Sequence, residues 1–203
     1  MKLIALIAAT SLALSGCVNL GLEGGKDAPE ITYYVLEDTG RTPASANLNL
    51  RVLVLTDTQA GAFYDTDGMA FSRQPGTRGY YQFARWSERA GKRFTDLLLA
   101  RLETEKLFGA IALTSGNVQG DWLLTTEIVE HYHDAGQQPG NIIMELRAEV
   151  VDIRARKLIA RKTFRQSVAA ASYDAAGAHK AFNQAATQTL NEIADWLKGL
   201  KQP

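Results

Sequence analysis

The strongest constraint on the fold is an alternation of apolar and polar side chains in three neighbouring segments, residues 122–132, 142–150 and 158–168. A period of two residues is typical of β-strands with one buried face. The apolar face of the middle segment is Ile142, Met144, Leu146, Ala148 and Val150. Turn residues at 134–140 and 154–157 separate the segments, so the sequence predicts an antiparallel meander.

Two further segments have apolar residues every three to four positions, which is typical of amphipathic helices. The first covers about residues 87–107, with Ser87 as its candidate N-cap. The second begins near Ala178 and ends near Gly199. Its apolar stripe is Phe182, Ala186, Leu190, Ile193, Leu197 and Leu200. Two long helices over a mainly antiparallel sheet predict an α+β fold, a two-layer domain.

Shorter strands are expected before the first helix. Residues 33–36 are rich in β-forming residues, and residues 69–74 and 79–83 predict a hairpin around Pro75-Gly76. A strand is also expected near 110–114. In the segment 48–56, one face is expected to carry the apolar residues Leu48, Leu50, Val52 and Val54.

The N-terminus has the features of an export signal. Lys2 precedes an apolar stretch of about a dozen residues, which is too short for a bilayer span of roughly 20 residues. The stretch ends in Leu14-Ser15-Gly16-Cys17, which resembles the bacterial lipobox. We therefore expect a signal peptide over 1–16, a lipid on Cys17, a flexible tether over 17–30 and one α+β domain over 31–203.

Two features of the sequence bear on location and partners. The residue after the cysteine is Val18 rather than Asp, which favours lipid anchoring at the periplasmic face of the outer membrane. The 22 basic and 22 acidic residues balance, which argues against a nucleic-acid partner. The sequence has one cysteine, so no internal disulfide is expected.

The sequence contains no complete catalytic or metal-binding pattern that we recognise. His131 and His133 are two residues apart and share a strand face, where Glu127 could join them. We expect a solvated strand face there rather than a metal site, because a third strong ligand is not evident. The segment Asp65-Thr66-Asp67-Gly68 has Met69 and Gly76 where a calcium loop needs oxygen ligands. We expect no enzyme activity, no metal and no cofactor.

A protein-binding surface is the better supported kind of site. Tyr, Trp and Arg are typical interface anchors, and the sequence concentrates them between residues 64 and 101. We expect the partner-binding residues to be Tyr80, Tyr81, Arg85, Arg89 and Arg93. A second basic run, residues 154–165, is expected to be a solvated face balanced by acids elsewhere.

The order of these features resembles the ABC-type transport auxiliary lipoprotein family. The resemblance rests on the lipobox, Tyr33-Tyr34-Val35-Leu36, the strand at 48–56, Asp67-Gly68-Met69-Ala70-Phe71, Gly79-Tyr80-Tyr81-Gln82-Phe83-Ala84-Arg85-Trp86 and Ala194-Asp195-Trp196-Leu197. One departure is Arg89-Ala90, where many members have proline. The resemblance implies a non-catalytic component of a lipid transport system that docks the periplasmic complex at the outer membrane. The implied partners are a mammalian-cell-entry domain protein, an ABC permease and ATPase, and a phospholipid.

Two alternatives stay open at the level of sequence. The chain could be an outer-membrane lipoprotein that regulates or assembles envelope enzymes. It could also be a periplasmic hydrolase that uses His131 or His133, and a pocket containing these histidines would favour that hypothesis.

Overall fold

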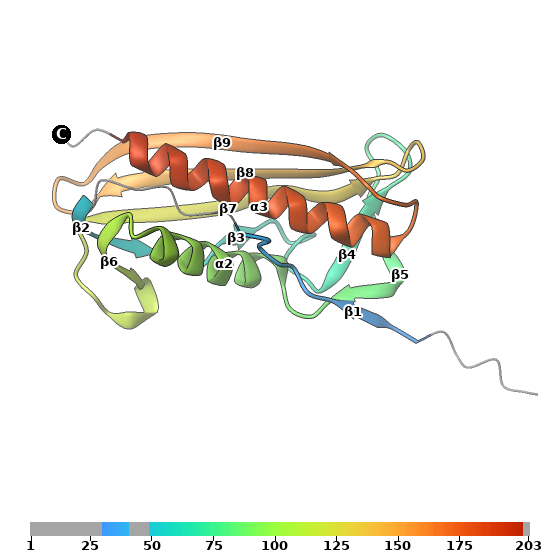
Figure 1. Cartoon of the computed structure of the whole chain (residues 1–203), viewed down its shortest axis with the longest axis horizontal. Coiled ribbons are helices and arrows are strands. Elements are labelled where there is room, and N and C mark those ends of the chain that lie inside the picture. Colours follow the sequence, from blue (N-terminus) through green and yellow to red (C-terminus); the bar gives the residue numbers. More distant parts are fainter. Residues whose placement is uncertain (1–29, 41–48, 201–203) are drawn as a thin grey trace, which may run out of the picture. The chain divides into compact units, whose positions relative to one another are not determined.

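The computed structural model describes residues 30–40 and 49–200, which contain a nine-stranded sheet and two α-helices (Figure 1). The strands are β1 (Thr32–Tyr34), β2 (Asn49–Leu55), β3 (Gln59–Ala60), β4 (Gly68–Ser72), β5 (Gly79–Trp86), β6 (Phe108–Leu113), β7 (Trp122–Asp134), β8 (Asn141–Asp152) and β9 (Lys157–Ala169). The helices are α2 (Ala90–Glu105) and α3 (Ala175–Gly199). These elements confirm the predicted α+β fold. The predicted signal peptide, Cys17 and the tether lie outside the described residues.

The strand β7 is the centre of the sheet. One edge pairs with β8 in antiparallel register over its whole length, and β9 continues the predicted meander. The other edge pairs in turn with three short parallel strands, β2, β3 and β4. The sheet is therefore mixed, and the hairpin of β4 and β5 lies at the same end as the β7–β8 turn.

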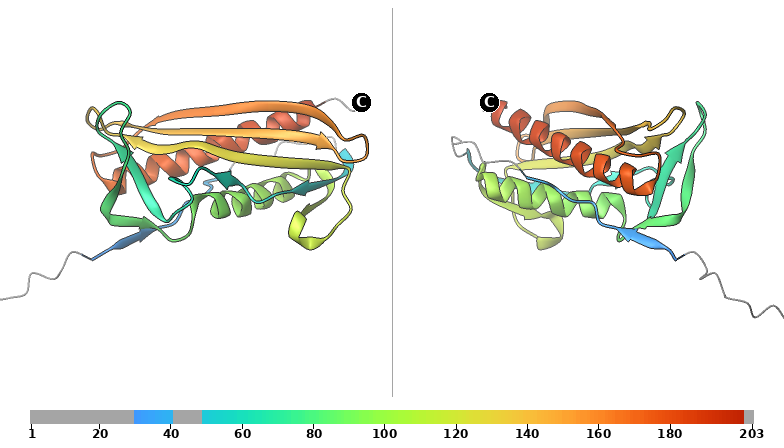
Figure 2. Two further views of the ribbon diagram at one scale, coloured as in Figure 1. Left: turned by 180° about the vertical axis from the view of Figure 1, so that it is seen from behind. Right: turned by 45° about the vertical axis from the view of Figure 1, so that its right-hand side comes forward.

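Both helices cover one face of the sheet, as the front and back views show (Figures 1 and 2). The predicted stripe of α3, from Phe182 through Ile193 to Leu197, is buried, which confirms the assignment of its core face. Phe94 of α2 and Trp122 of β7 are also fully buried in this core. Neither described helix has the combination of length and apolar character that crossing a membrane requires.

The opposite face of the sheet carries cross-strand ion pairs. Arg147 pairs with Glu127 at 2.8 Å, Arg161 with Glu149 at 2.6 Å, and Arg165 with Glu145 at 3.2 Å. Opposite charges across neighbouring strands stabilise a sheet modestly. Arg161 and Arg165 belong to the second basic run, so these two residues lie on a balanced polar face, as the sequence predicts.

The predicted face of the histidines is wrong because β7 contains a bulge. The pairing with β8 shifts between Ile128 and Glu130, so one extra residue is inserted and the alternation changes phase. Even-numbered residues face the helices before the bulge, whereas His131 and His133 face them after it. His131 packs 4.5 Å from the Phe182 ring and 5.5 Å from the Trp86 ring, measured between centroids. Burial lowers the pKa of His131 to about 4.

Two local expectations also differ from the structure. In β2, Leu50 is 82% exposed, whereas Leu53 and Leu55 join the core, so the opposite set of alternating residues packs under the helices. The pairing of β2 with β6 shifts between Asn49 and Val52. Ser87 is not the cap of α2: its N–H donates to the Tyr34 carbonyl, and α2 begins three residues later.

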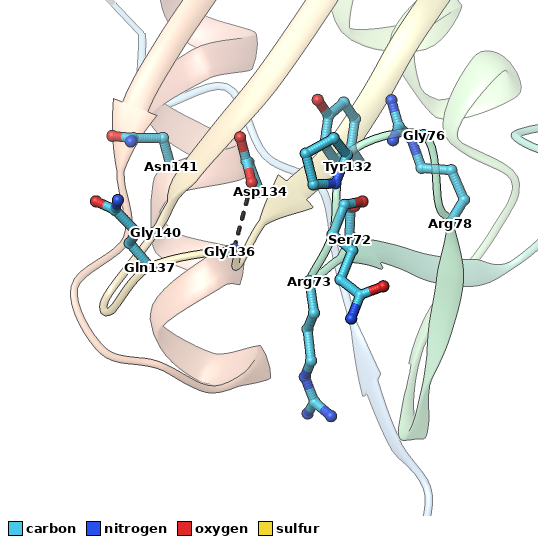
Figure 3. A pocket seen from close by; sticks show the side chains of 12 residues that line it. Ser72, Arg73, Gly76, Arg78, Tyr132, Asp134, Gly136, Gln137, Gly140 and Asn141 are labelled. Atoms are coloured by element: carbon cyan, nitrogen blue, oxygen red, sulfur yellow. Dashed lines mark hydrogen bonds between the residues drawn. The ribbon is translucent and has the colours of Figure 1, made fainter.

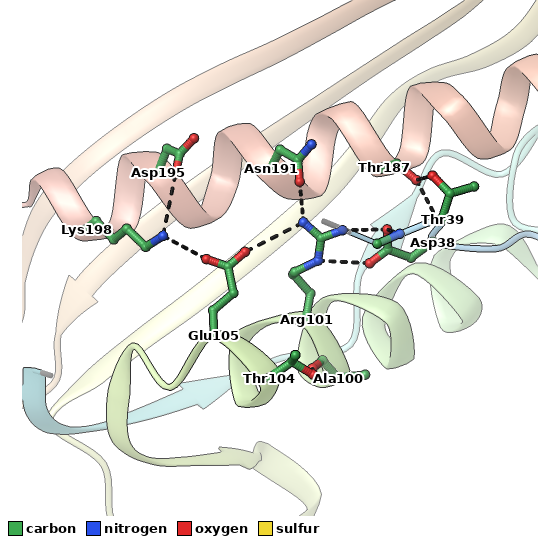
Figure 4. Close-up of polar contacts among 11 residues, drawn as sticks. Asp38, Thr39, Ala100, Arg101, Thr104, Glu105, Thr187, Asn191, Asp195 and Lys198 are labelled. Atoms are coloured by element: carbon green, nitrogen blue, oxygen red, sulfur yellow. Dashed lines mark hydrogen bonds and ion pairs between the residues drawn. The ribbon is translucent and has the colours of Figure 1, made fainter. Parts of the chain in front are cut away.

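A polar segment, residues 36–39, lies along α2 and α3 and is held by both (Figure 4). The backbone N–H groups of Glu37 and Thr39 donate to Asn183 and Thr187 of α3. The Asp38 carboxylate accepts two bonds from the Arg101 guanidinium, at 2.9 and 2.6 Å. Arg101 is nearly fully buried, so this arginine is a core residue rather than a surface cation.

Removing Asp38 tests whether this ion pair holds the 36–39 segment. Asp38→Ala should lower the free energy of unfolding by up to about 3–5 kcal/mol, which is the cost when a buried ion pair loses one partner. The exposed pair of Glu127 and Arg147 gives a matched control, and Glu127→Ala should cost roughly 0–1 kcal/mol. Chemical denaturation would measure both values, and equal costs would contradict the assigned role of Asp38.

His131 predicts a loss of stability in mild acid. Between pH of about 6.5 and about 4, the unfolded chain binds a proton at this imidazole that the folded chain does not. The free energy of unfolding should therefore fall as the pH falls through this window, by about 3 kcal/mol in total from His131. The variant His131→Phe should lose this part of the pH dependence. An unchanged slope in the variant, measured by denaturant titration at each pH, would show that His131 is not buried in its neutral form.

Candidate partner-binding surface

Tyr80 of β5 is held as a rigid, partly exposed ring. It stacks on Phe63 with the ring centroids 4.6 Å apart, and its hydroxyl donates to the Phe63 carbonyl at 2.5 Å. A side chain at Gly68 on the neighbouring strand would collide with the Tyr80 ring, so glycine there makes room for it. The ring is 37% exposed. Tyr80 is therefore presented to solvent in a fixed orientation.

Tyr81 is fixed by a different set of contacts, on His133. The His133 Nε2 lies 2.9 Å from the Pro139 carbonyl, which can only accept, so Nε2 carries the proton. The Nδ1 atom then accepts from the Tyr81 hydroxyl at 2.7 Å. Burial raises the pKa of Tyr81 to about 12 and lowers the pKa of His133, so both groups are neutral in this arrangement.

The turn after β7 makes this contact possible. Gly140 has a φ of +84°, and an added side chain there would collide with the His133 ring and the Asp134 carbonyl. A glycine is needed at such a position because other residues rarely adopt positive φ. The turn can therefore lie against His133, and through His133 it holds Tyr81.

A hollow of about 460 Å³ opens beside these tyrosines, and we call it the aromatic hollow. It is lined by Tyr34, Phe71, Arg73, Tyr80, Tyr81, Gln82, Phe83, Ala84 and Ala175. Phe83 is 41% exposed. The guanidinium of Arg73, which is also exposed, lies 5.1 Å from the centroid of the Phe71 ring. The aromatic hollow therefore combines exposed apolar rings with a cation.

A second, polar hollow of about 640 Å³ lies between the β4–β5 turn and the β7–β8 turn (Figure 3). Its Arg78 is already engaged: it stacks 3.6 Å from the centroid of Tyr132 and donates to Glu130 at 3.0 Å. Arg73 lines both hollows, and its side chain extends away from Asp134 and Arg78. Arg78 is thus engaged by other side chains, whereas Arg73 has no ion pair among the described residues and can meet a ligand.

The predicted arginines lie in three different settings. Arg85 donates to the carbonyls of Tyr81 and Ala84, so it braces the backbone of its own strand. Arg89 forms an exposed pair with Asp65 at 3.3 Å. Arg93 donates to the Leu36 carbonyl at 2.8 Å. Tyr80 and Tyr81 line the hollow, and these three arginines do not.

The residues that sequence reasoning missed as site residues are Phe71, Arg73 and Phe83. Phe71 and Arg73 are two positions apart at the end of a strand, so a shared face was a usable signal for their stacking. Phe83 gave no such signal, because β5 has a register shift against β4 that a sequence pattern does not reveal.

The histidines and Glu127 do not form a common site. His131 and His133 are buried under the helices, whereas Glu127 lies on the open face and pairs with Arg147. Within residues 30–40 and 49–200, no three His, Cys, Asp or Glu side chains are close enough to hold a metal ion. The neutral, hydrogen-bonded state of His133 fits a structural role.

Comparison with solved structures identifies proteins of the same fold. Protein XCC0632 from Xanthomonas campestris, of the DUF330 family, is 24% identical, with 81% of this chain and 93% of that chain covered and a TM-score of 0.74. The hypothetical protein CT253 from Chlamydia trachomatis is 12% identical, with 75% and 98% covered and a TM-score of 0.52. An uncharacterized protein is 13% identical, with 83% and 99% covered and a TM-score of 0.65.

Comparison of the sequence itself is more specific. No functionally curated protein matches this chain. The family model of the ABC-type transport auxiliary lipoprotein component matches residues 34–194, which include every strand from β2 to β9, all of α2 and most of α3. The match covers well over half of the chain, so the chain belongs to the family of ABC-type transport auxiliary lipoproteins.

Proposed function

We propose that this chain is a non-catalytic component of a lipid transport system that contains a mammalian-cell-entry domain protein. It docks the periplasmic transport complex at the outer membrane, with the lipid on Cys17 as its anchor. The observation that carries the proposal is the family match over residues 34–194. The lipobox at Cys17 and the absence of Asp at position 18 support the anchor and its location.

Binding rather than catalysis is supported by the state of the described histidines. Both ring nitrogens of His133 are hydrogen-bonded, and His131 is buried among aromatic rings. The Nε2 of His179 lies 2.8 Å from the Val35 carbonyl, where it serves to hold the backbone. A general base must reach the proton of its substrate, and hydrogen bonds occupy both nitrogens of His133 while burial separates His131 from solvent.

The aromatic hollow is our candidate for the docking point. Tyrosine and arginine are among the residue types that dominate binding energies at interfaces, and the hollow presents both beside the exposed ring of Phe83. Tyr80 and Tyr81 are held by contacts within the chain, so binding would not need to order them.

The proposed function predicts specific co-purification. The full-length lipidated chain, isolated from mildly solubilised membranes, should bring down the mammalian-cell-entry protein and the ABC permease encoded with it. Cys17→Ser should prevent lipidation and mature processing, while the folding of the domain stays unchanged. Intact mass would verify the lipid, and immunoblots would follow the partners.

Two outcomes would contradict the proposal. An unmodified Cys17 in the mature wild-type chain would remove the lipid anchor. Reproducible co-purification of an envelope enzyme without any transport component would favour the alternative regulatory function.

A further inference from the structure

We propose that the aromatic hollow binds a peptide segment of the transport partner in which an apolar side chain lies beside a carboxylate. The apolar side chain enters the hollow next to Tyr80 and Phe83, and the carboxylate pairs with Arg73. This inference rests on the proposed function and adds the chemistry of the segment that is recognised.

The apolar half of the inference follows from the lining of the hollow. Phe71, Tyr80, Tyr81 and Phe83 supply aromatic walls, and Ala84 and Ala175 leave room between them. Tyr80 and Phe83 are more than one third exposed. Burying such rings against an aliphatic or aromatic side chain removes apolar surface from water on both partners.

The carboxylate half follows from the charge of Arg73. Within the part of the chain that the structure describes, its guanidinium contacts the Phe71 ring and has no ion pair. The neighbouring carboxylates are held by their own turns: Asp134 accepts from the Gly136 N–H at 3.3 Å, and Asp174 accepts from the Gly177 N–H at 2.7 Å. Arg73 is thus a cation with an open side, and its planar head suits bidentate recognition of a carboxylate.

The size and shape of the hollow favour a peptide over a lipid. A bilayer about 30 Å thick in its hydrocarbon core implies acyl chains about 15 Å long, and these need a long groove. The hollow is an open depression of about 460 Å³, and the polar residue Gln82 is part of its lining. A single apolar side chain fits such a depression, and the adjacent backbone places a neighbouring carboxylate at the rim.

A photo-crosslinking experiment in cells identifies the occupant. The photoreactive residue p-benzoylphenylalanine would replace Phe83 in the full-length lipidated chain, and in a matched control it would replace Leu158, which is 51% exposed at the other end of the sheet. Irradiation should crosslink position 83 to the mammalian-cell-entry protein, at a segment with an apolar residue next to Asp or Glu. The crosslink should be lost when Arg73→Glu is added, and position 158 should not form it.

Affinity measurements with the purified partner test the charge. Arg73→Glu should weaken binding about tenfold or more, because it opposes two negative charges. Arg73→Lys should be intermediate, since lysine keeps the charge and loses the planar stacking. Arg156→Glu, an exposed arginine in the β8–β9 turn, should bind as wild type does. Wild-type affinity should fall with added salt, and Arg73→Ala should fall less steeply.

The outcomes separate this inference from the proposed function. A lipid adduct at position 83 would overturn the peptide assignment. Wild-type binding that neither Arg73→Glu nor Phe83→Ser weakens would overturn the inference and leave the proposed function standing. Failure of the wild-type chain to bind any transport component would overturn both. Circular dichroism and melting temperatures of the variants would show that each remains folded.

Discussion

The pairing of β7 on both edges is the constraint on which the rest of the structure depends. Its antiparallel edge builds the meander with β8 and β9, and its parallel edge collects β2, β3 and β4. A strand of 13 residues paired along both sides is held in one register, and a one-residue shift would exchange its buried and exposed faces. The bulge between Ile128 and Glu130 makes that exchange once, within a single strand, so different faces of β7 pack under the helices before and after it.

The candidate binding site follows from this change of face. After the bulge, His133 lies under the helices, and its two ring nitrogens connect the β7–β8 turn to Tyr81 of β5. Tyr81 and Tyr80 then border the aromatic hollow, where Arg73 leaves the end of β4. A residue that sequence reasoning treated as a possible metal ligand is therefore a support for a surface that binds a partner in our proposal.

The parts of the fold that could be predicted from sequence are those whose pattern is local. The stripe of α3 and the alternation of β8 repeat with the helical and strand periods, so their buried faces were correct. The bulge was not predictable, because both faces of a regular strand here would carry apolar or aromatic residues. Val129 would lie on one face and Tyr132 on the other. The role of Arg101 also depends on distant partners, Asp38 and Asn191, which only the tertiary structure brings together.

The candidate site was predicted in part for the same reason. Tyr80 and Tyr81 were identified from composition, since aromatic and arginine residues are common at interfaces. Composition does not distinguish an arginine with an open side, such as Arg73, from one that binds the backbone, such as Arg93. That distinction depends on which acceptors the fold places within reach of each guanidinium.

The most direct test of the proposed binding mode is a structure of the lipidated chain in complex with its mammalian-cell-entry partner, determined by cryo-electron microscopy. An apolar side chain of the partner should occupy the aromatic hollow, with a carboxylate oxygen within hydrogen-bond distance of the Arg73 guanidinium. A complex in which the aromatic hollow faces solvent and the partner contacts another surface would contradict it.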